Sequence, residues 1–102
     1  MDQLQVIVDA ELDSQVLLVP HGDQWHVSHA NLSARSLLGQ NLRLPAVGAI
    51  VAGCRSVWDD GVPINLADVH WPGEQRWFDV RIRALYARVS LTLIDVTLQH
   101  LS

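Results

Sequence analysis

Apolar residues follow two different periods along this chain. From residue 77 to residue 96 they alternate with polar residues, which is the period of strands with one face buried. From residue 45 to residue 60 they recur at every third or fourth position, which is the period of a helix that packs one side on a core. The two patterns in one chain predict an α+β fold.

Turn and cap residues mark where the elements begin and end. Asn31 is a typical N-cap, and Gly39 and Asp60-Gly61 are typical helix ends. The predicted helices cover residues 2–12, 31–39 and 45–60, and the predicted strands cover residues 15–19, 25–29, 64–69, 75–84 and 88–96. Because short loops join neighbouring strands in antiparallel pairs, we predict a five-stranded antiparallel sheet. The helices should pack on one of its faces, with a short N-terminal helix in addition.

The alternation fixes the register of the last two strands. The pairs expected on the inner face are Leu91 with Ile82, Leu93 with Val80, and Asp95 with Phe78. The outer face of the same strands then carries Trp77, Ile94 and Val96, with Trp71 near them. An apolar group of this size seldom stays in contact with water, so either the N-terminal helix or a second subunit should cover it.

Length and composition limit the kinds of protein this chain can be. Its 102 residues are enough for one small domain, and the hydrophobic content of 49% is that of a globular protein. A net charge of −4 does not favour nucleic acid as a partner, and no apolar run approaches the roughly 20 residues of a membrane span. Since the N-terminus lacks the basic segment of a secretory signal, we expect a cytoplasmic domain.

Three segments carry a further pattern. They are NLSARSLLG at 31–39, DGVPINLADVHWPGEQRWFDVRIRAL at 60–85 and LTLIDVT at 91–97. In this order they resemble PAS domains, the sensory domains of bacterial-type signalling proteins. The resemblance implies a PAS domain over residues 15–98, preceded by a helix or cap over 1–14. The Asp-x-Thr motif marks the usual exit from such a domain, so residues 99–102 are expected to start a linker helix to an effector domain.

The resemblance also implies a function in signal transduction, as in two-component systems. A sensory and dimerisation module of this family relays the state of a ligand or partner to a C-terminal effector, such as a histidine kinase or a diguanylate cyclase. Two alternatives stay open, a ligand-free protein–protein interaction module and a small α+β enzyme. Catalysis is not expected, because the sequence has neither a Gly-x-Ser-x-Gly elbow nor a phosphate-binding glycine loop.

The chain lacks the residues that hold the chromophores of some PAS domains. Cys54 lies on the apolar stripe of the long helix, in AGCRSVW, and not in the Asn-Cys-Arg-Phe-Leu-Gln motif of flavin-binding members. That helix contains no histidine for haem. His26 and His29 are three apart in a strand, where alternation predicts opposite faces and disfavours a shared metal. We therefore expect no flavin, haem or metal.

A small apolar ligand is the alternative to a filled core. In this family such ligands lie between the long helix and the inner face of the sheet. The lining expected here is apolar and consists of Ile50, Val51, Cys54, Val57, Phe78, Val80 and Leu91. Because this lining offers few polar groups to orient a ligand, side chains that fill the space are the better expectation.

Two further groups of residues are candidates for function. Asp95 ends an inward-facing series, so it should lie at the rim of the sheet and cap the next helix or pair with an arginine, with Thr97 sharing the cap. These two residues are the expected signal relay. A homodimer is expected through apolar residues of the N-terminal helix and the outer sheet face, which are Leu4, Ile7, Val8, Trp77, Ile94 and Val96.

Overall fold

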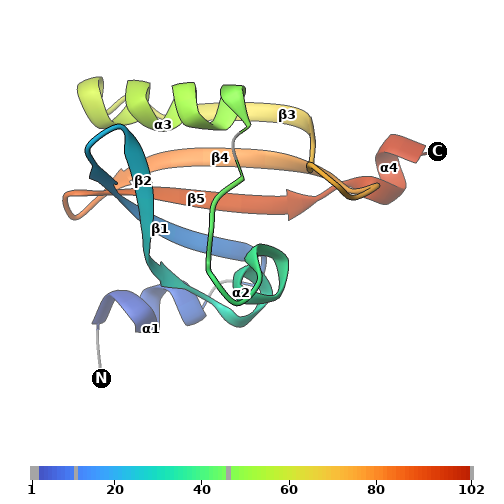
Figure 1. Cartoon of the computed structure of the whole chain (residues 1–102), viewed down its shortest axis with the longest axis horizontal. Helices are drawn as coiled ribbons and strands as arrows, with labels where there is room; N and C mark the ends of the chain where they lie inside the picture. The colour runs from blue at the N-terminus through green and yellow to red at the C-terminus, as the bar shows by residue number, and fades with distance from the viewer. Residues whose placement is uncertain (1–2, 11, 46, 102) are drawn as a thin grey trace.

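The computed structural model describes the backbone of residues 3–10, 12–45 and 47–101. Within them the chain forms one five-stranded sheet and four helices (Figure 1). The strands are β1 (Ser14–His21), β2 (Gln24–Ala30), β3 (Ile64–His70), β4 (Trp77–Leu85) and β5 (Arg88–Asp95). The helices are α1 (Gln3–Asp9), α2 (Leu32–Leu38), α3 (Gly48–Asp60) and α4 (Thr97–Leu101). Residues 1, 2 and 11 of the expected N-terminal segment, 46 of the long helix and 102 of the linker lie outside the described residues.

The strands lie in the order β2-β1-β5-β4-β3, and every neighbouring pair is antiparallel. This confirms the predicted α+β class and the five-stranded antiparallel sheet. Short turns connect β1 to β2 and β4 to β5, and the pairing of β1 with β5 joins the two halves of the sheet. The first and the fifth strand are therefore neighbours in the middle of the sheet.

The register of β4 and β5 is the predicted one. Phe78 pairs with Asp95, Val80 with Leu93 and Ile82 with Leu91. The five apolar members of these pairs are at most 1% exposed. Hydrophobic alternation is sufficient to set this register, because a slip by one residue would turn all five side chains to the other face.

β2 departs from simple alternation. Its pairing with β1 shifts beside Leu17, so that His29 pairs with Leu17 and His26 pairs with Val19. Ser28 is the extra residue of this β-bulge, and its hydroxyl donates to the Leu17 carbonyl oxygen at 3.3 Å. Leu17 and Val19 are two apart on β1 and share a face. The expectation that alternation separates His26 from His29 is therefore wrong, because the bulge cancels it.

Local signals explain the ends of two helices. The Asn31 side chain accepts a hydrogen bond from the Ala34 N–H at 3.0 Å, which confirms Asn31 as the N-cap of α2. Gly39 follows as the C-cap, and its N–H donates to the Arg35 carbonyl oxygen. α3 ends at Gly61, whose φ of 74° is a left-handed conformation that glycine adopts without strain.

Two helices are shorter than the apolar pattern predicts. α1 ends at Asp9 and not at residue 12, and Leu12 is almost fully exposed. α3 begins at Gly48 and not at Pro45, whose carbonyl oxygen accepts a hydrogen bond from the Val47 N–H at 2.8 Å in a turn. Apolar spacing continues through both segments, so it does not locate these helix ends.

α2 and α3 cover the inner face of the sheet, with α3 beside β3, β4 and β5 (Figure 1). The helix comes close to the sheet at Gly53, which is buried in α3. A Cβ atom added there would lie 2.6 Å from the Cδ1 atom of Ile82 in β4. The absence of a side chain at this one position therefore lets α3 rest directly on the sheet.

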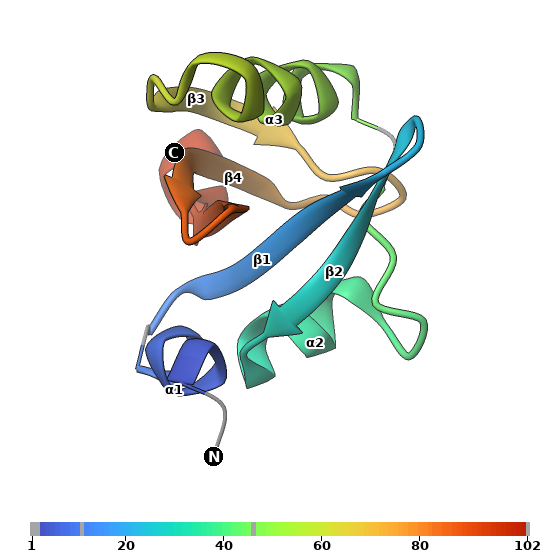
Figure 2. The ribbon, with the colours of Figure 1, turned by 90° about the vertical axis from the view of Figure 1, so that its left-hand side faces the viewer.

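α1 covers part of the outer face, where it contacts β1 and β2. Leu17 of β1 points to this face because both of its neighbours belong to the inner core, and it is fully buried, as is Val8 of α1. Figure 2 shows α1 and α2 on either side of the β1–β2 hairpin, at the end opposite its turn. α1 thus docks on its own sheet, over strands other than β4, which carries Trp77.

Candidate functional site

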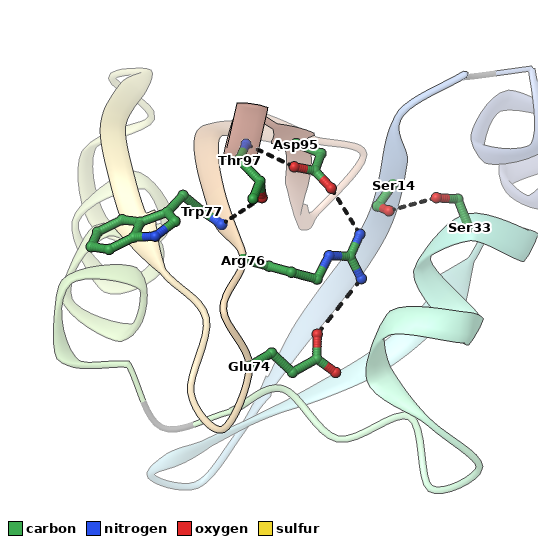
Figure 3. Close-up of polar contacts among 7 residues, drawn as sticks. All are labelled: Ser14, Ser33, Glu74, Arg76, Trp77, Asp95 and Thr97. Atoms are coloured by element: carbon green, nitrogen blue, oxygen red, sulfur yellow. Dashed lines mark hydrogen bonds and ion pairs between the residues drawn. The ribbon is translucent and has the colours of Figure 1, made fainter. Parts of the chain in front are cut away.

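Asp95 joins the end of β5 to the start of α4 (Figure 3). Its Oδ1 atom accepts a hydrogen bond from the Thr97 N–H at 2.9 Å, which closes an Asx turn at the first residue of the helix. Its Oδ2 atom accepts a hydrogen bond from the Arg76 guanidinium at 3.0 Å. The carboxylate therefore caps the helix and pairs with an arginine at once. We call Arg76, Asp95 and Thr97 the exit junction.

Arg76 connects the exit junction to the core. Its guanidinium binds Asp95 and also lies 3.7 Å from a carboxylate oxygen of Glu74. Its Cζ atom lies 5.1 Å from the centroid of the Phe78 ring, within the range of a cation–π contact. The buried Phe78 ring in turn contacts Trp71 edge to face, with centroids 5.3 Å apart. One arginine thus contacts both a buried phenylalanine and the carboxylate that precedes α4.

Thr97 attaches the first turn of α4 to the start of β4. Its hydroxyl oxygen accepts a hydrogen bond from the Trp77 N–H at 3.0 Å (Figure 3). The Trp77 carbonyl oxygen accepts another from the Val96 N–H at 2.8 Å. Both backbone polar groups of Trp77 are therefore used by the two residues that follow Asp95. A movement of α4 away from the sheet must break these hydrogen bonds.

The surroundings of Asp95 favour its charged form. Hydrogen bonds from the Thr97 side chain, the Thr97 N–H and Arg76 lower the pKa of Asp95 from its ordinary 3.8, although partial burial acts in the opposite direction. The Asp95 side chain is 45% exposed, so water screens its ion pair with Arg76 and keeps the contribution of that pair modest. Asp95 is a carboxylate at neutral pH.

A pair of serines connects β1 to α2 at the same end of the sheet as the exit junction. Ser14 pairs with Leu93 of β5, two residues before Asp95. The hydroxyl oxygens of Ser14 and Ser33 lie 2.7 Å apart in a hydrogen bond (Figure 3). The start of β1, the start of α2 and the end of β5 therefore meet beside the exit junction.

Six of the seven residues expected to line a ligand pocket are packed in one core. They are at most 1% exposed, and they are Ile50, Cys54, Val57, Phe78, Val80 and Leu91. The contact of Gly53 with Ile82 brings α3 close to the sheet beside them. The apolar face of α3 therefore packs against side chains of the sheet.

Val51 does not belong to that lining. It is 36% exposed and lies on the wall of a surface groove of about 580 Å³, together with Trp25, Arg43 and Pro45. The reason is helix geometry: successive residues point about 100° apart, so Val51 turns away from the core that Ile50 enters.

The residues expected at a dimer surface fall into two groups. Leu4, Ile7 and Val8 lie on α1, over β1 and β2, whereas Trp77, Ile94 and Val96 lie where β4 and β5 meet α4. Val8 is buried within the chain, and the other five are half-buried. The structure thus separates the helix residues from the Trp77 group within one chain.

Trp71 lies on the face opposite to the expected one. It is 4% exposed and packs in the inner core against Phe78. The register of β3 shifts between Leu66 and Val69, so that Val69 pairs with Phe78. Because this bulge moves the alternation by one residue, Trp71 faces the core as Val69 does.

Cys54 is a core residue with an unreactive thiol. Its side chain is fully buried in α3, on the apolar stripe where the sequence places it. Burial raises the pKa of Cys54 to about 12, so almost no thiolate forms near neutral pH.

Neither a metal centre nor a membrane span occurs among the described residues. No three His, Cys, Asp or Glu side chains in this part of the chain are placed to hold a metal ion. None of the described helices is long and apolar enough to cross a membrane.

Arg76 is the member of the exit junction that the sequence pattern does not single out. The same region also contains Arg81 and Arg83, and Arg83 instead donates to the Asn65 side chain at 2.9 Å. The available signal is register: Asp95 pairs with Phe78, and Arg76 precedes Phe78 by two positions. A residue two positions along an extended chain points to the same side, which brings Arg76 to Asp95.

Comparison with known proteins assigns no family to the chain. No protein-family model matches it, and neither does any curated protein.

Proposed function

We propose that this chain is a PAS-like sensory and dimerisation module that relays the state of a ligand or partner to an effector domain after α4. The observation that carries the proposal is the contact of Arg76 with both the buried Phe78 ring and Asp95, which holds the first N–H of α4. A change in the core that moves Phe78 would act on Arg76 and through it on the start of the helix. The module itself performs no catalysis.

The arrangement of the elements supports the same proposal. α2 and α3 cover the inner face, and α4 extends from the end of β5 beyond the sheet (Figure 1). β5 is paired on both sides, with β1 and with β4. A helix attached to this strand is well placed to respond to both halves of the sheet. Histidine kinases and diguanylate cyclases are the proposed effectors, because a helix can connect them to a sensor.

A fusion protein tests the relay. Residues 1–102 are joined to the catalytic domain of a diguanylate cyclase that is active only as a dimer, at about four successive junction lengths that cover one helical turn. In the active fusion, Asp95→Ala should change the cyclase rate by about twofold or more, since the loss of a helix cap is worth about 0.5–2 kcal/mol. Asp59→Ala, at the exposed end of α3, is the control. Equal rates for folded wild type and Asp95→Ala would contradict the relay.

A ligand-free interaction module is the second candidate, and the packing of α3 favours it. Gly53 brings α3 within contact of β4, and the six buried lining residues already fill one core. A partner protein would then provide the signal. Native mass spectrometry and an absorption spectrum of the purified chain distinguish the two candidates. A small molecule bound in stoichiometric amount decides for a ligand sensor, and the mass of the bare chain favours the interaction module.

Homodimerisation is the remaining part of the proposal. Leu4 and Ile7 of α1 and Ile94 of β5 are half-buried apolar residues that a second copy could cover. Ile94→Glu should bring an unpaired charge into that interface and shift the protein to monomer in sedimentation at micromolar concentration. Arg81→Glu, which changes an exposed residue of β4, is the control. A monomeric wild type would refute the dimer. Ile94 is a sharper choice than Trp77, because Trp77 also contacts α4.

A further inference from the structure

The indole ring of Trp77 contacts imidazole rings from two different elements. His100 of α4 stacks on it, with ring centroids 3.6 Å apart and an angle of 21° between the planes. His70 of β3 lies against the same indole with centroids 4.7 Å apart and an angle of 45°. The His100 stack is a second attachment of α4 to β4, about one helical turn beyond Thr97.

A carboxylate lies beside the stacked imidazole. The Oδ1 atom of Asp68 is 3.9 Å from the Nδ1 atom of His100. Asp68 lies at the bulge of β3 with a φ of 52°, a conformation uncommon outside glycine, and its N–H donates to the Asp79 carboxylate at 3.1 Å. Bulges often re-aim a side chain. This bulge brings a negative charge to the helix that follows the sheet.

The charge of His100 decides how strongly these contacts hold. Histidine is the side chain that ordinarily changes charge between about pH 5 and 8. A neutral His100 stacks on Trp77 as one aromatic ring on another. A protonated His100 is in addition attracted by the negative face of the indole and by Asp68. Because both attractions exist only while α4 is docked, protonation favours the docked helix.

Other titratable and charged groups belong to the strands and segments next to α4. They are Asp68 and His70 on β3, Asp79 on β4, Asp95 at the end of β5, and Glu74 and Arg76 before β4. Arg76 is paired with Asp95 and Glu74, so its charge is largely balanced. The carboxylates strengthen the attraction for a protonated His100. His70 is a second imidazole on the same indole, so its effect must be separated by substitution.

We infer that His100, Trp77 and Asp68 form a pH-dependent latch that holds α4 on the sheet more firmly when His100 is protonated. The latch is a property of these residues and goes beyond the relay proposed above, because it requires no effector. Where the relay operates, the latch makes the position of the exit helix respond to acid.

NMR spectroscopy of the whole chain measures the latch. The ¹³Cα shifts and ¹⁵N relaxation of residues 97–100 report the fraction of docked, helical α4 at about pH 5.5 and about pH 8, on either side of the ordinary range of histidine. The ratio of docked to undocked helix should be about three- to tenfold higher at the lower pH, from one exposed cation–π contact and one exposed ion pair.

Three variants identify the groups responsible. His100→Gln should abolish the response, because glutamine takes up no charge. Asp68→Asn should reduce it by about two- to threefold, the size of an exposed ion pair. The Asp68→Asn substitution should preserve the bulge of β3, since asparagine tolerates a positive φ. His70→Gln is the matched control, a histidine on the same indole, and should keep the response.

Two results would overturn the latch: equal docked fractions of α4 at both pH values in the wild type, or an unchanged response in His100→Gln. The latch would be supported, and the relay contradicted, by two results together. The pH response of α4 would be lost in His100→Gln, and the cyclase rate of the fusion protein would not change in Asp95→Ala. The two proposals can therefore fail separately.

Discussion

Arg76 and Asp95 are 19 residues apart in the chain and meet at the open end of the β4–β5 hairpin, where Nη2 and Oδ2 are 3.0 Å apart. The same arginine lies over Phe78, and the same aspartate holds the Thr97 N–H. This pair therefore links the core to the start of α4.

The Arg76–Asp95 pair should show a small but measurable coupling. Arg76→Ala and Asp95→Ala should each lower the free energy of unfolding, and the double variant should lose less than their sum by about 0.2–1 kcal/mol, as for other exposed pairs. The range is low because the two side chains are 42% and 45% exposed. Urea denaturation of the four proteins gives the value, with Arg81→Ala as a control for removing an exposed arginine. Fully additive losses would show that the pair does not interact.

Acid should weaken the fold through Asp95. Because the pKa of Asp95 is lower in the folded chain than its ordinary 3.8, the unfolded state binds the proton more tightly. The stability that Asp95 contributes is fully present above the ordinary pKa and is lost as the pH falls through the folded pKa. We expect Asp95→Asn to flatten the decline of the unfolding free energy below about pH 4. An NMR titration that places the Asp95 carboxyl at or above 3.8 would contradict this.

Thr97→Val should destabilise the chain by about 1–3 kcal/mol, because valine keeps the shape of threonine but leaves the Trp77 N–H without its acceptor. Thr97→Ser retains the hydroxyl and should cost less. Urea denaturation measures the loss of unfolding free energy in both variants. Amide hydrogen exchange at Trp77 should be faster than in the wild type in Thr97→Val but not in Thr97→Ser. Equal unfolding midpoints for the valine and serine variants would show that the hydroxyl has no such role.

Gly53→Ala should cost about 1–3 kcal/mol through overpacking, partly offset by the better helix propensity of alanine. The added Cβ meets the Ile82 Cδ1 atom at 2.6 Å, and Ile82→Val removes that atom. Gly53→Ala should therefore be milder in an Ile82→Val background than in the wild type. Gly48→Ala is the matched control, since a Cβ there has no neighbour within 4 Å. Thermal unfolding that shows the same loss at both glycines would disprove the close contact.

Sequence patterns predicted the parts of the fold that depend on local or strictly alternating signals. The pairing of Phe78 with Asp95 follows from apolar residues that alternate without interruption on both strands. The Asn31 cap follows from one side chain and a backbone N–H three residues later. In both cases the residues that decide the structure are close in sequence or in a regular register.

The remaining features depend on irregular backbone that composition does not mark. The bulges at Ser28 and Asp68 each move the alternation by one residue, and neither position carries the glycine that would have signalled it. For this reason the faces of His29 and Trp71 could not be predicted. Arg76 lies before β4 and outside the alternating apolar series, so the apolar pattern does not single it out. Its contact with Asp95 follows only when the pairing of Asp95 with Phe78 is also considered.

The pairing of β1 with β5 also has a consequence for biosynthesis. It pairs Gln15 with Thr92, which lies 77 residues further along the chain. While the chain emerges from the ribosome, the edge of β1 that pairs with β5 stays unpaired until β5 is synthesised. An unpaired strand edge makes the nascent chain prone to aggregation. Because closing so long a loop has a high entropic cost, we expect the arrival of β5, and not the formation of the helices, to limit the rate of folding.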